Sequence, residues 1–74
     1  MTPRELGKTI RLARRAAGLR QHELAGAADV GVRFIVDLEA GKPTAQMGKT
    51  LTVLAALGCR LTVELPPAPK TKHT

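Results

Sequence analysis

Apolar side chains recur every three or four positions over the first 58 residues of the chain, and this is the spacing of one face of an α-helix. Polar and charged residues fill most of the positions between them. The pattern predicts four helices, over residues 3–17, 21–28, 32–40 and 45–57. We expect a single, mainly helical domain, because 74 residues provide material for one small core only.

Residues at the ends of these stretches support the predicted boundaries. Thr2-Pro3-Arg4-Glu5 is a capping box with proline in the first helical position. Gly18, Gly41 and Gly58 stand where a left-handed residue ends a helix. Arg20 occupies the position where Ser or Thr would cap the second helix, so we expect that helix to begin with a weak cap.

Each predicted helix has an apolar face that we expect to line the core. In chain order these faces comprise Leu6, Ile10, Ala13 and Ala17; Leu24, Ala25 and Ala28; Ile35 and Leu38; and Met47, Leu51, Leu54 and Leu57. Between the second and third helices, Asp29-Val30-Gly31 forms a compact turn. Two short helices joined by such a turn, the second followed by a glycine, form a helix-turn-helix, which can place a helix in the major groove of DNA.

From Cys59 to Leu65 the pattern changes to strict alternation of apolar and polar residues, which predicts a half-buried β-strand. One isolated strand cannot satisfy its backbone groups, and the sequence contains no second strand, so we expect this one to pair with another molecule. Antiparallel pairing of two copies about Thr62 would place Arg60 opposite Glu64. The predicted dimer interface comprises Cys59, Arg60, Leu61, Thr62, Val63, Glu64 and Leu65.

Two alternatives to this pairing remain open: the strand docks on a different protein, or it is an ordered extended tail. In the paired arrangement, the apolar side chains of the strand would cover the fourth helices of both copies. The sequence therefore divides into a helix-turn-helix domain over residues 1–58, a dimerisation strand over 59–65, and a proline-rich, polar tail over 66–74 that we expect to be flexible.

The formal net charge of +6 is large for this length and is unevenly distributed. The first 20 residues carry one acid, Glu5, and six cations, whereas the charges of residues 21–58 nearly cancel. The six cations are Arg4, Lys8, Arg11, Arg14, Arg15 and Arg20. A basic block beside a neutral body suits a polyanion such as nucleic acid, although solvated basic faces are common on small helical domains.

Other function classes find little support in the sequence. No apolar run approaches the roughly 20 residues of a membrane-spanning helix, and the charged N-terminal stretch does not resemble a secretory signal, so we expect a cytoplasmic, nucleoid-associated protein. The single cysteine, Cys59, cannot form an internal disulfide or hold a metal alone. His22 and His73 have no accompanying catalytic set, so we expect neither an enzyme nor a bound cofactor.

The sequence resembles the Xre/Cro-type phage-repressor family over about three quarters of its length. The resemblance is carried by three segments, Gly18-Leu19-Arg20-Gln21-His22-Glu23-Leu24-Ala25, Ala28-Asp29-Val30-Gly31 and Ile35 to Pro43. The resemblance implies a four-helix, lambda-repressor-like helix-turn-helix fold. The closing part of the sequence is similar to the HipB-type antitoxins, in which a C-terminal strand pairs across a homodimer. This similarity is carried by Glu39 to Ala45, Lys49-Thr50-Leu51 and the strand after Leu57-Gly58. Such antitoxins repress their own operon and bind a HipA-type kinase toxin.

The resemblance to this family also assigns roles to individual residues. The residues placed against the bases are Gly31, Val32, Arg33, Val36 and Asp37. Phosphate contacts are implied for Arg20, Gln21, Lys42 and Arg11, and an ion pair between Arg14 and Glu39 holds the first helix to the third. Any of the cations assigned to phosphate could instead be solvated surface. The ion pair is structural first, with contact to phosphate as its second possible role.

The chemistry of the side chains fits several of these roles. Arg33 can form two hydrogen bonds with guanine, Val32 and Val36 can contact a thymine methyl group, and Asp37 could accept from cytosine N4. Arg33 and Asp37 could instead form a solvated face. For Phe34, packing against the fourth helix and contact with a base both remain open.

Three functions follow as hypotheses. The first is an autoregulating repressor and antitoxin that binds a palindromic operator in double-stranded DNA as a homodimer and docks a kinase toxin. The second is a stand-alone Xre-type repressor with no protein partner. The third is an interaction module whose basic face binds acidic protein or RNA.

Overall fold

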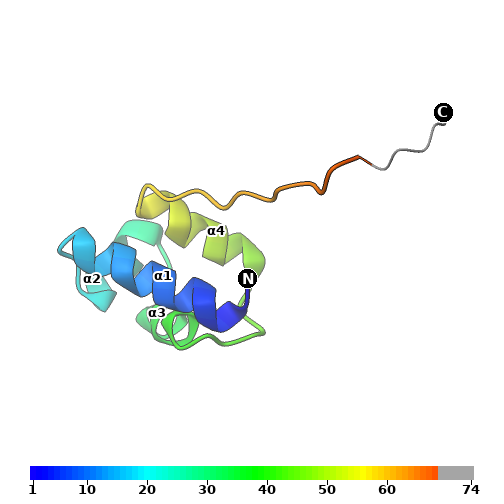
Figure 1. Cartoon of the computed structure of the whole chain (residues 1–74). Coiled ribbons are helices and arrows are strands. Elements are labelled where there is room, and N and C mark those ends of the chain that lie inside the picture. Colours follow the sequence, from blue (N-terminus) through cyan, green and yellow to red (C-terminus); the bar gives the residue numbers. More distant parts are fainter. Residues whose placement is uncertain (69–74) are drawn as a thin grey trace.

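The computed structural model describes residues 1–68 and contains four helices in that range. They are α1 (Pro3–Ala16), α2 (Gln21–Ala28), α3 (Val32–Glu39) and α4 (Met47–Ala56). Helix α3 packs against both α1 and α2, and α4 packs against α2. Figure 1 shows α1 with α3 on one side and α4 on the other. The mainly helical, four-helix prediction is therefore confirmed, and the helix boundaries agree with the predicted ones to within two residues.

The start of α1 has the predicted capping box. The hydroxyl of Thr2 accepts a hydrogen bond of 3.1 Å from the Glu5 amide, and the Glu5 carboxylate accepts one of 2.7 Å from the Thr2 amide. At the start of α2 the Arg20 side chain makes no capping hydrogen bond, as predicted, but the Glu23 carboxylate accepts from the Arg20 amide at 2.7 Å. Helix α2 is thus capped from its third residue rather than by a Ser or Thr side chain.

Each of the three turns between the helices contains a residue with left-handed backbone, namely Gly18, Asp29 or Gly41. Asp29 ends α2 with a φ of 56°, a conformation that Asp tolerates better than most residues. Gly41 follows α3 with a φ of 86°, and a Cβ there would lie 2.8 Å from the Cα of Arg4. Only glycine allows the chain to turn this close to the start of α1.

The core consists of apolar side chains from all four helices, namely Ile10, Leu24, Ala25, Ala28, Ile35, Leu38, Val53 and Leu54. The predicted inward faces of α2 and α3 are confirmed by this set. The predicted face of α1 was wrong at its C-terminal end: Ala17 is exposed, and the buried positions besides Ile10 are Gly7 and Arg14. The face is rotated because Gly7 and Arg14 are the residues that meet α3.

The predicted apolar stripe of α4 is confirmed at Leu54, which is in the core, and at Leu57, which packs against it, but it was wrong at Met47 and Leu51. Met47 and Leu51 are 60% and 45% exposed, whereas Thr50 and Val53 are buried beside Leu54. The Thr50 hydroxyl donates to the Gln46 carbonyl at 2.8 Å, which satisfies a polar group inside the core. Helix α4 therefore turns one apolar face toward α2 and leaves a second apolar face uncovered.

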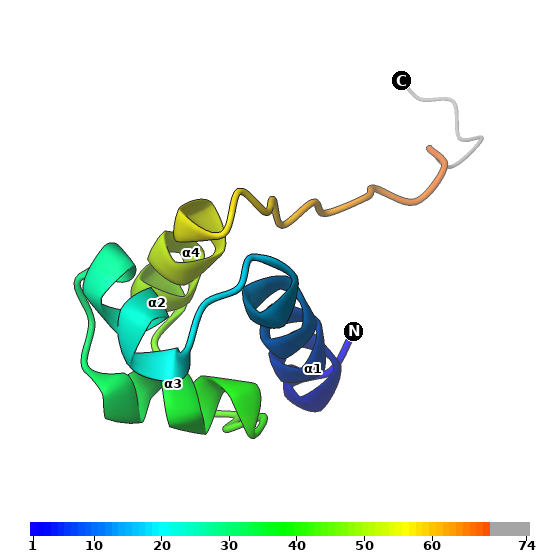
Figure 2. The ribbon, with the colours of Figure 1, turned by 90° about the vertical axis from the view of Figure 1, so that its left-hand side faces the viewer.

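The chain after α4 is extended, and no strand is assigned anywhere in residues 1–68. Figure 2 shows the segment leaving the helices beyond the end of α4. Cys59 is half-buried, and its amide donates to the Leu54 carbonyl at 2.9 Å; the following residues are exposed. Pairing of residues 59–65 with a second copy stays a prediction. Of the predicted tail, residues 66–68 have no regular structure, and 69–74 lie outside the described residues.

No helix in the described part of the chain has both the length and the apolar content needed to cross a bilayer.

Candidate nucleic-acid interface

Helices α2 and α3 and the turn between them form the helix-turn-helix. Gly31 is the N-cap of α3, and Val30 is half-buried against the core, with its amide donating to the Ala25 carbonyl at 3.0 Å. Ile35 and Leu38 anchor the inner face of α3. The tight turn and these two anchors fix α3 across α2, so that the opposite face of α3 points away from the core.

The residues assigned to base reading lie at the start of α3 and along this outer face. Gly31, Val32, Arg33 and Val36 are exposed, and Asp37 is half-buried. The four residues within α3 have the spacing of one helical face. The structure thus brings together every residue that the sequence places against the bases.

Two ion pairs run along the outer face of α3. Arg33 Nε donates to Asp37 Oδ1 at 3.1 Å, and Lys42 Nζ, from the loop after α3, lies 3.6 Å from Asp37 Oδ2. The Arg33 side chain is 85% exposed and that of Asp37 is 26% exposed. Arg33 is therefore much more open to solvent than the carboxylate that it contacts.

Phe34 lies half-buried against the core, and Lys49 Nζ of α4 is 5.8 Å from the centroid of its ring. This distance is within the range of a cation–π contact. The structure supports packing, rather than base contact, as the role of Phe34.

A basic groove lies at the junction of α1, α2 and α3. Its lining consists of Arg11, Arg14, Arg15, Arg20, Gln21, Val36, Glu39 and Ala40. Three of the four residues assigned to phosphate contact, Arg11, Arg20 and Gln21, meet here, whereas Lys42 lies elsewhere beside Asp37. Arg15 was counted in the basic block of the sequence but was not assigned to phosphate contact, although its position four residues after Arg11 places both on the same side of α1.

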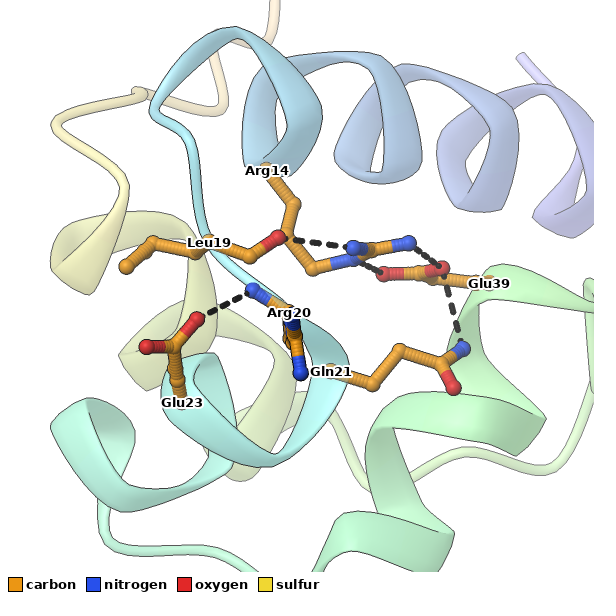
Figure 3. Close-up of polar contacts among 6 residues, drawn as sticks. All are labelled: Arg14, Leu19, Arg20, Gln21, Glu23 and Glu39. Carbon is orange, nitrogen blue, oxygen red and sulfur yellow. Dashed lines mark hydrogen bonds and ion pairs between the residues drawn. The ribbon is translucent and has the colours of Figure 1, made fainter.

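Arg14 and Glu39 form a buried ion pair at the base of this groove (Figure 3). Arg14 Nε donates to Glu39 Oε2 at 2.6 Å, and Nη2 donates to Oε1 at 3.0 Å. A third donor, Nη1, reaches the carbonyl of Leu19 at 2.8 Å, and Gln21 Nε2 donates to Glu39 Oε1 at 3.2 Å. The network joins α1, the start of α2 and the end of α3, so it fixes the angle at which α3 is presented.

The pKa of Arg14 is raised above its ordinary value, because the Glu39 carboxylate accepts hydrogen bonds from the charged guanidinium. The side chains of Arg14 and Glu39 are only 9% and 4% exposed. In the described part of the chain, no buried side-chain nitrogen or oxygen lacks a hydrogen-bond partner. Arg14 is thus a structural residue, while its neighbours Arg11, Arg15 and Arg20 are exposed to solvent.

A second cationic cluster lies on the other side of α3. Lys42 and Lys49 border a small depression together with Phe34, Asp37, Thr44, Ala45 and Gln46. The outer face of α3 therefore lies between the basic groove and a pair of lysines. A helix inserted in the major groove has one phosphate backbone on each side, and this arrangement of charge fits that environment.

Among residues 1–68, no three His, Cys, Asp or Glu side chains come together in a way that could hold a metal ion.

Comparison with known proteins agrees with the geometry. A family model described as a helix-turn-helix domain matches residues 5–65 of the chain. The chain is 58% identical over 65 residues to an uncharacterized HTH-type transcriptional regulator, y4mF, of Sinorhizobium fredii (strain NBRC 101917 / NGR234). The match spans 88% of this chain and 86% of that protein. The family match begins within the first turn of α1 and continues past α4 to residue 65.

Proposed function

Because the chain belongs to the helix-turn-helix domain family, we propose that it is a transcriptional repressor that inserts α3 into the major groove of a palindromic operator. The observation that carries the proposal is the position of the outer face of α3 between two cationic clusters. In this arrangement the clusters contact the backbone and fix the register, while α3 reads the bases.

The base-reading residues are Gly31, Val32, Arg33, Val36 and Asp37. Gly31 has no side chain, so the start of α3 can approach the edge of the groove closely. Val32 and Val36 suit thymine methyl groups, and Arg33 suits guanine. This assignment predicts an operator with at least one guanine and one thymine in each half-site.

The phosphate-contacting residues are Arg11, Arg20 and Gln21 in the basic groove and Lys42 beside Asp37. Arg15 and Lys49 extend the same two clusters. Gln21 is the first residue of α2, so its backbone amide has no partner within the helix and can donate to a phosphate. These contacts supply affinity that does not depend on sequence.

The repressor acts as a homodimer in this proposal, with residues 1–58 as the DNA-binding domain and 59–65 as the pairing strand. The uncovered apolar face of α4 supports it. Met47, Thr50 and Leu61 line an apolar groove of about 240 Å³, together with Leu6 and Pro3 of α1. A second copy that added its strand to residues 59–65 would cover this face and supply the missing backbone partners.

The likeness to HipB-type antitoxins motivates a finer version of the proposal, in which the dimer also binds a HipA-type kinase toxin. A plain Xre-type repressor without such a partner is the alternative. Copurification of the full chain with a kinase encoded beside it would support the antitoxin role. A dimer that represses its promoter but binds no such kinase would favour the plain repressor.

The experiment that tests DNA binding is selection of duplexes from a random library by the full chain, followed by titration of the enriched sequence at several salt concentrations. We expect one palindrome to be enriched, with affinity that falls steeply as salt rises. Equal binding to every duplex, or tighter binding to single-stranded RNA of the same length, would contradict the proposal and favour the interaction module.

A further inference from the structure

The side chain of Asp37 has a cation at each of its carboxylate oxygens. Arg33 Nε donates to Oδ1 at 3.1 Å, and Lys42 Nζ lies 3.6 Å from Oδ2. The carboxylate is also less exposed than the guanidinium that it contacts, at 26% against 85%. Asp37 is therefore the more covered member of the pair, and its charge is compensated by a cation at each oxygen.

This position is unfavourable for reading a base directly. A cytosine amino group would have to approach past the more exposed Arg33, and it would meet a carboxylate whose charge two cations already share. The benefit of a charged acceptor depends on the field that it presents to the donor, and neighbouring cations reduce that field. Asp37 is better placed to act on Arg33 than on DNA.

The hydrogen bond to Asp37 leaves the outer edge of the Arg33 guanidinium unused. With Nε occupied, Nη1 and Nη2 remain free, and no partner within residues 1–68 accepts from either of them. These two nitrogens form an edge that can donate two parallel hydrogen bonds, to O6 and N7 of guanine. A free arginine must lose much of its side-chain freedom to do this, and a fixed Nε reduces that loss.

We propose that Asp37 is a positioning residue that holds Arg33 for end-on recognition of guanine and does not itself read a base. The proposal rests on the proposed DNA-binding function and refines the assignment of Asp37 within it. Specificity for guanine then comes from one base pair per half-site, which is read by Arg33 from the first turn of α3 and sharpened by Asp37.

The test compares the base preferences of the full chain with those of Arg33→Ala, Asp37→Asn and the double variant, each measured on the palindrome that the unmodified chain enriches. We expect Arg33→Ala to remove the preference for guanine at one base pair of each half-site. Asp37→Asn should weaken the preference at that same base pair by about two- to fivefold, which is the range of an exposed ion pair. It should change nothing further when Arg33 is already Ala.

Lys42→Gln is the control, because it leaves the Arg33–Asp37 pair in place and removes a proposed phosphate contact. We expect it to weaken binding to all duplexes alike and to retain the guanine preference. A relaxed preference at a different base pair in Asp37→Asn would overturn the proposal and make Asp37 a base reader. An unchanged preference would overturn it too, leaving Asp37 as solvated surface. If the unmodified chain enriched no sequence, the proposed function itself would fail.

Discussion

Gly7 of α1 lies directly against the carbonyl oxygen of Leu38 in α3. A Cβ at residue 7 would be 2.8 Å from the neighbouring carbonyl oxygen of Glu39, and closer still to that of Leu38. Both obstacles are backbone atoms, which cannot rotate away as a flexible side chain can. The absence of a side chain at Gly7 therefore sets the distance between α1 and the helix proposed to read DNA.

We predict that Gly7→Ala lowers the free energy of unfolding by about 1–3 kcal/mol, the usual cost of overpacking a core. The matched control is Gly26→Ala in α2, where a Cβ would meet nothing within 4 Å. That variant should be more stable than the original chain by about 0.5–1 kcal/mol, because alanine favours the helix. Urea unfolding followed by circular dichroism measures both, and equal effects of the two substitutions would contradict the role of Gly7.

The buried pair of Arg14 and Glu39 gives a second prediction about stability. Glu39→Leu should destabilise the fold by about 3 kcal/mol, because it leaves the Arg14 guanidinium buried without a countercharge. Arg14→Met should have a similar effect, because it leaves the Glu39 carboxylate buried without a countercharge. The double variant Arg14→Met/Glu39→Leu should recover most of the loss, because an apolar pair of similar volume leaves no uncompensated charge. Additive losses in a double-mutant cycle would argue against a coupled pair.

Local signals in the sequence were enough to predict most of the fold. The capping box at Thr2 and Glu5 depends on residues three positions apart, so the pattern alone locates the start of α1. The inner faces of α2 and α3 were predicted for the same reason. In α4, both the stripe through Leu51 and the one through Val53 have helical spacing, and only packing against α2 decides between them.

Local signals of this kind could not predict contacts between distant segments of the chain. The pairing of Arg14 with Glu39, 25 residues apart, was available only from resemblance to a family. The groove that brings Arg15 together with the residues proposed to contact phosphate depends on the angle between α1 and α3. The contact of Lys42 with Asp37 requires the path of the loop that follows Gly41. Each of these contacts depends on how the helices pack against one another. The periodicity of residues within one helix carries no information about that packing.

Two substitutions that remove the same charge should separate backbone contact from base reading. Arg15→Ala should weaken binding to every duplex and reduce the slope of log K against log salt by about 1.8, as expected for two lost phosphate contacts, one from each copy of the dimer. Arg33→Ala should cost about 1–3 kcal/mol for each half-site of the selected palindrome and relax specificity at one base pair of each half-site. Fluorescence anisotropy titrations at four salt concentrations measure both slopes. An equal loss on all sequences in Arg33→Ala would mark it as a phosphate contact.

The proposed dimer predicts a strong effect at Leu61. This residue lines the apolar groove beside Met47 and Thr50, and Leu61→Glu would introduce two charges, related by the two-fold axis, under the paired strands. We expect that variant to sediment as a monomer at concentrations where the original chain is a dimer. Leu12→Glu is the control, since Leu12 is 63% exposed on α1 and lines none of the described grooves. A Leu61→Glu variant that remained dimeric would rule out pairing through this segment.

The register of the paired strands can be tested by exchanging charges. Pairing about Thr62 places Arg60 of each copy opposite Glu64 of the other, so one substitution alters two cross-strand contacts at once. Arg60→Glu should therefore raise the dissociation constant of the dimer by about tenfold, because two attractive pairs become repulsive, and Glu64→Arg should act similarly. The double variant Arg60→Glu/Glu64→Arg should restore the original constant, since it reverses both partners of each pair. Sedimentation equilibrium measures all three. A double variant as weak as the single ones would mean that these residues do not face each other, and that a two-fold centred on Thr62 is the wrong register.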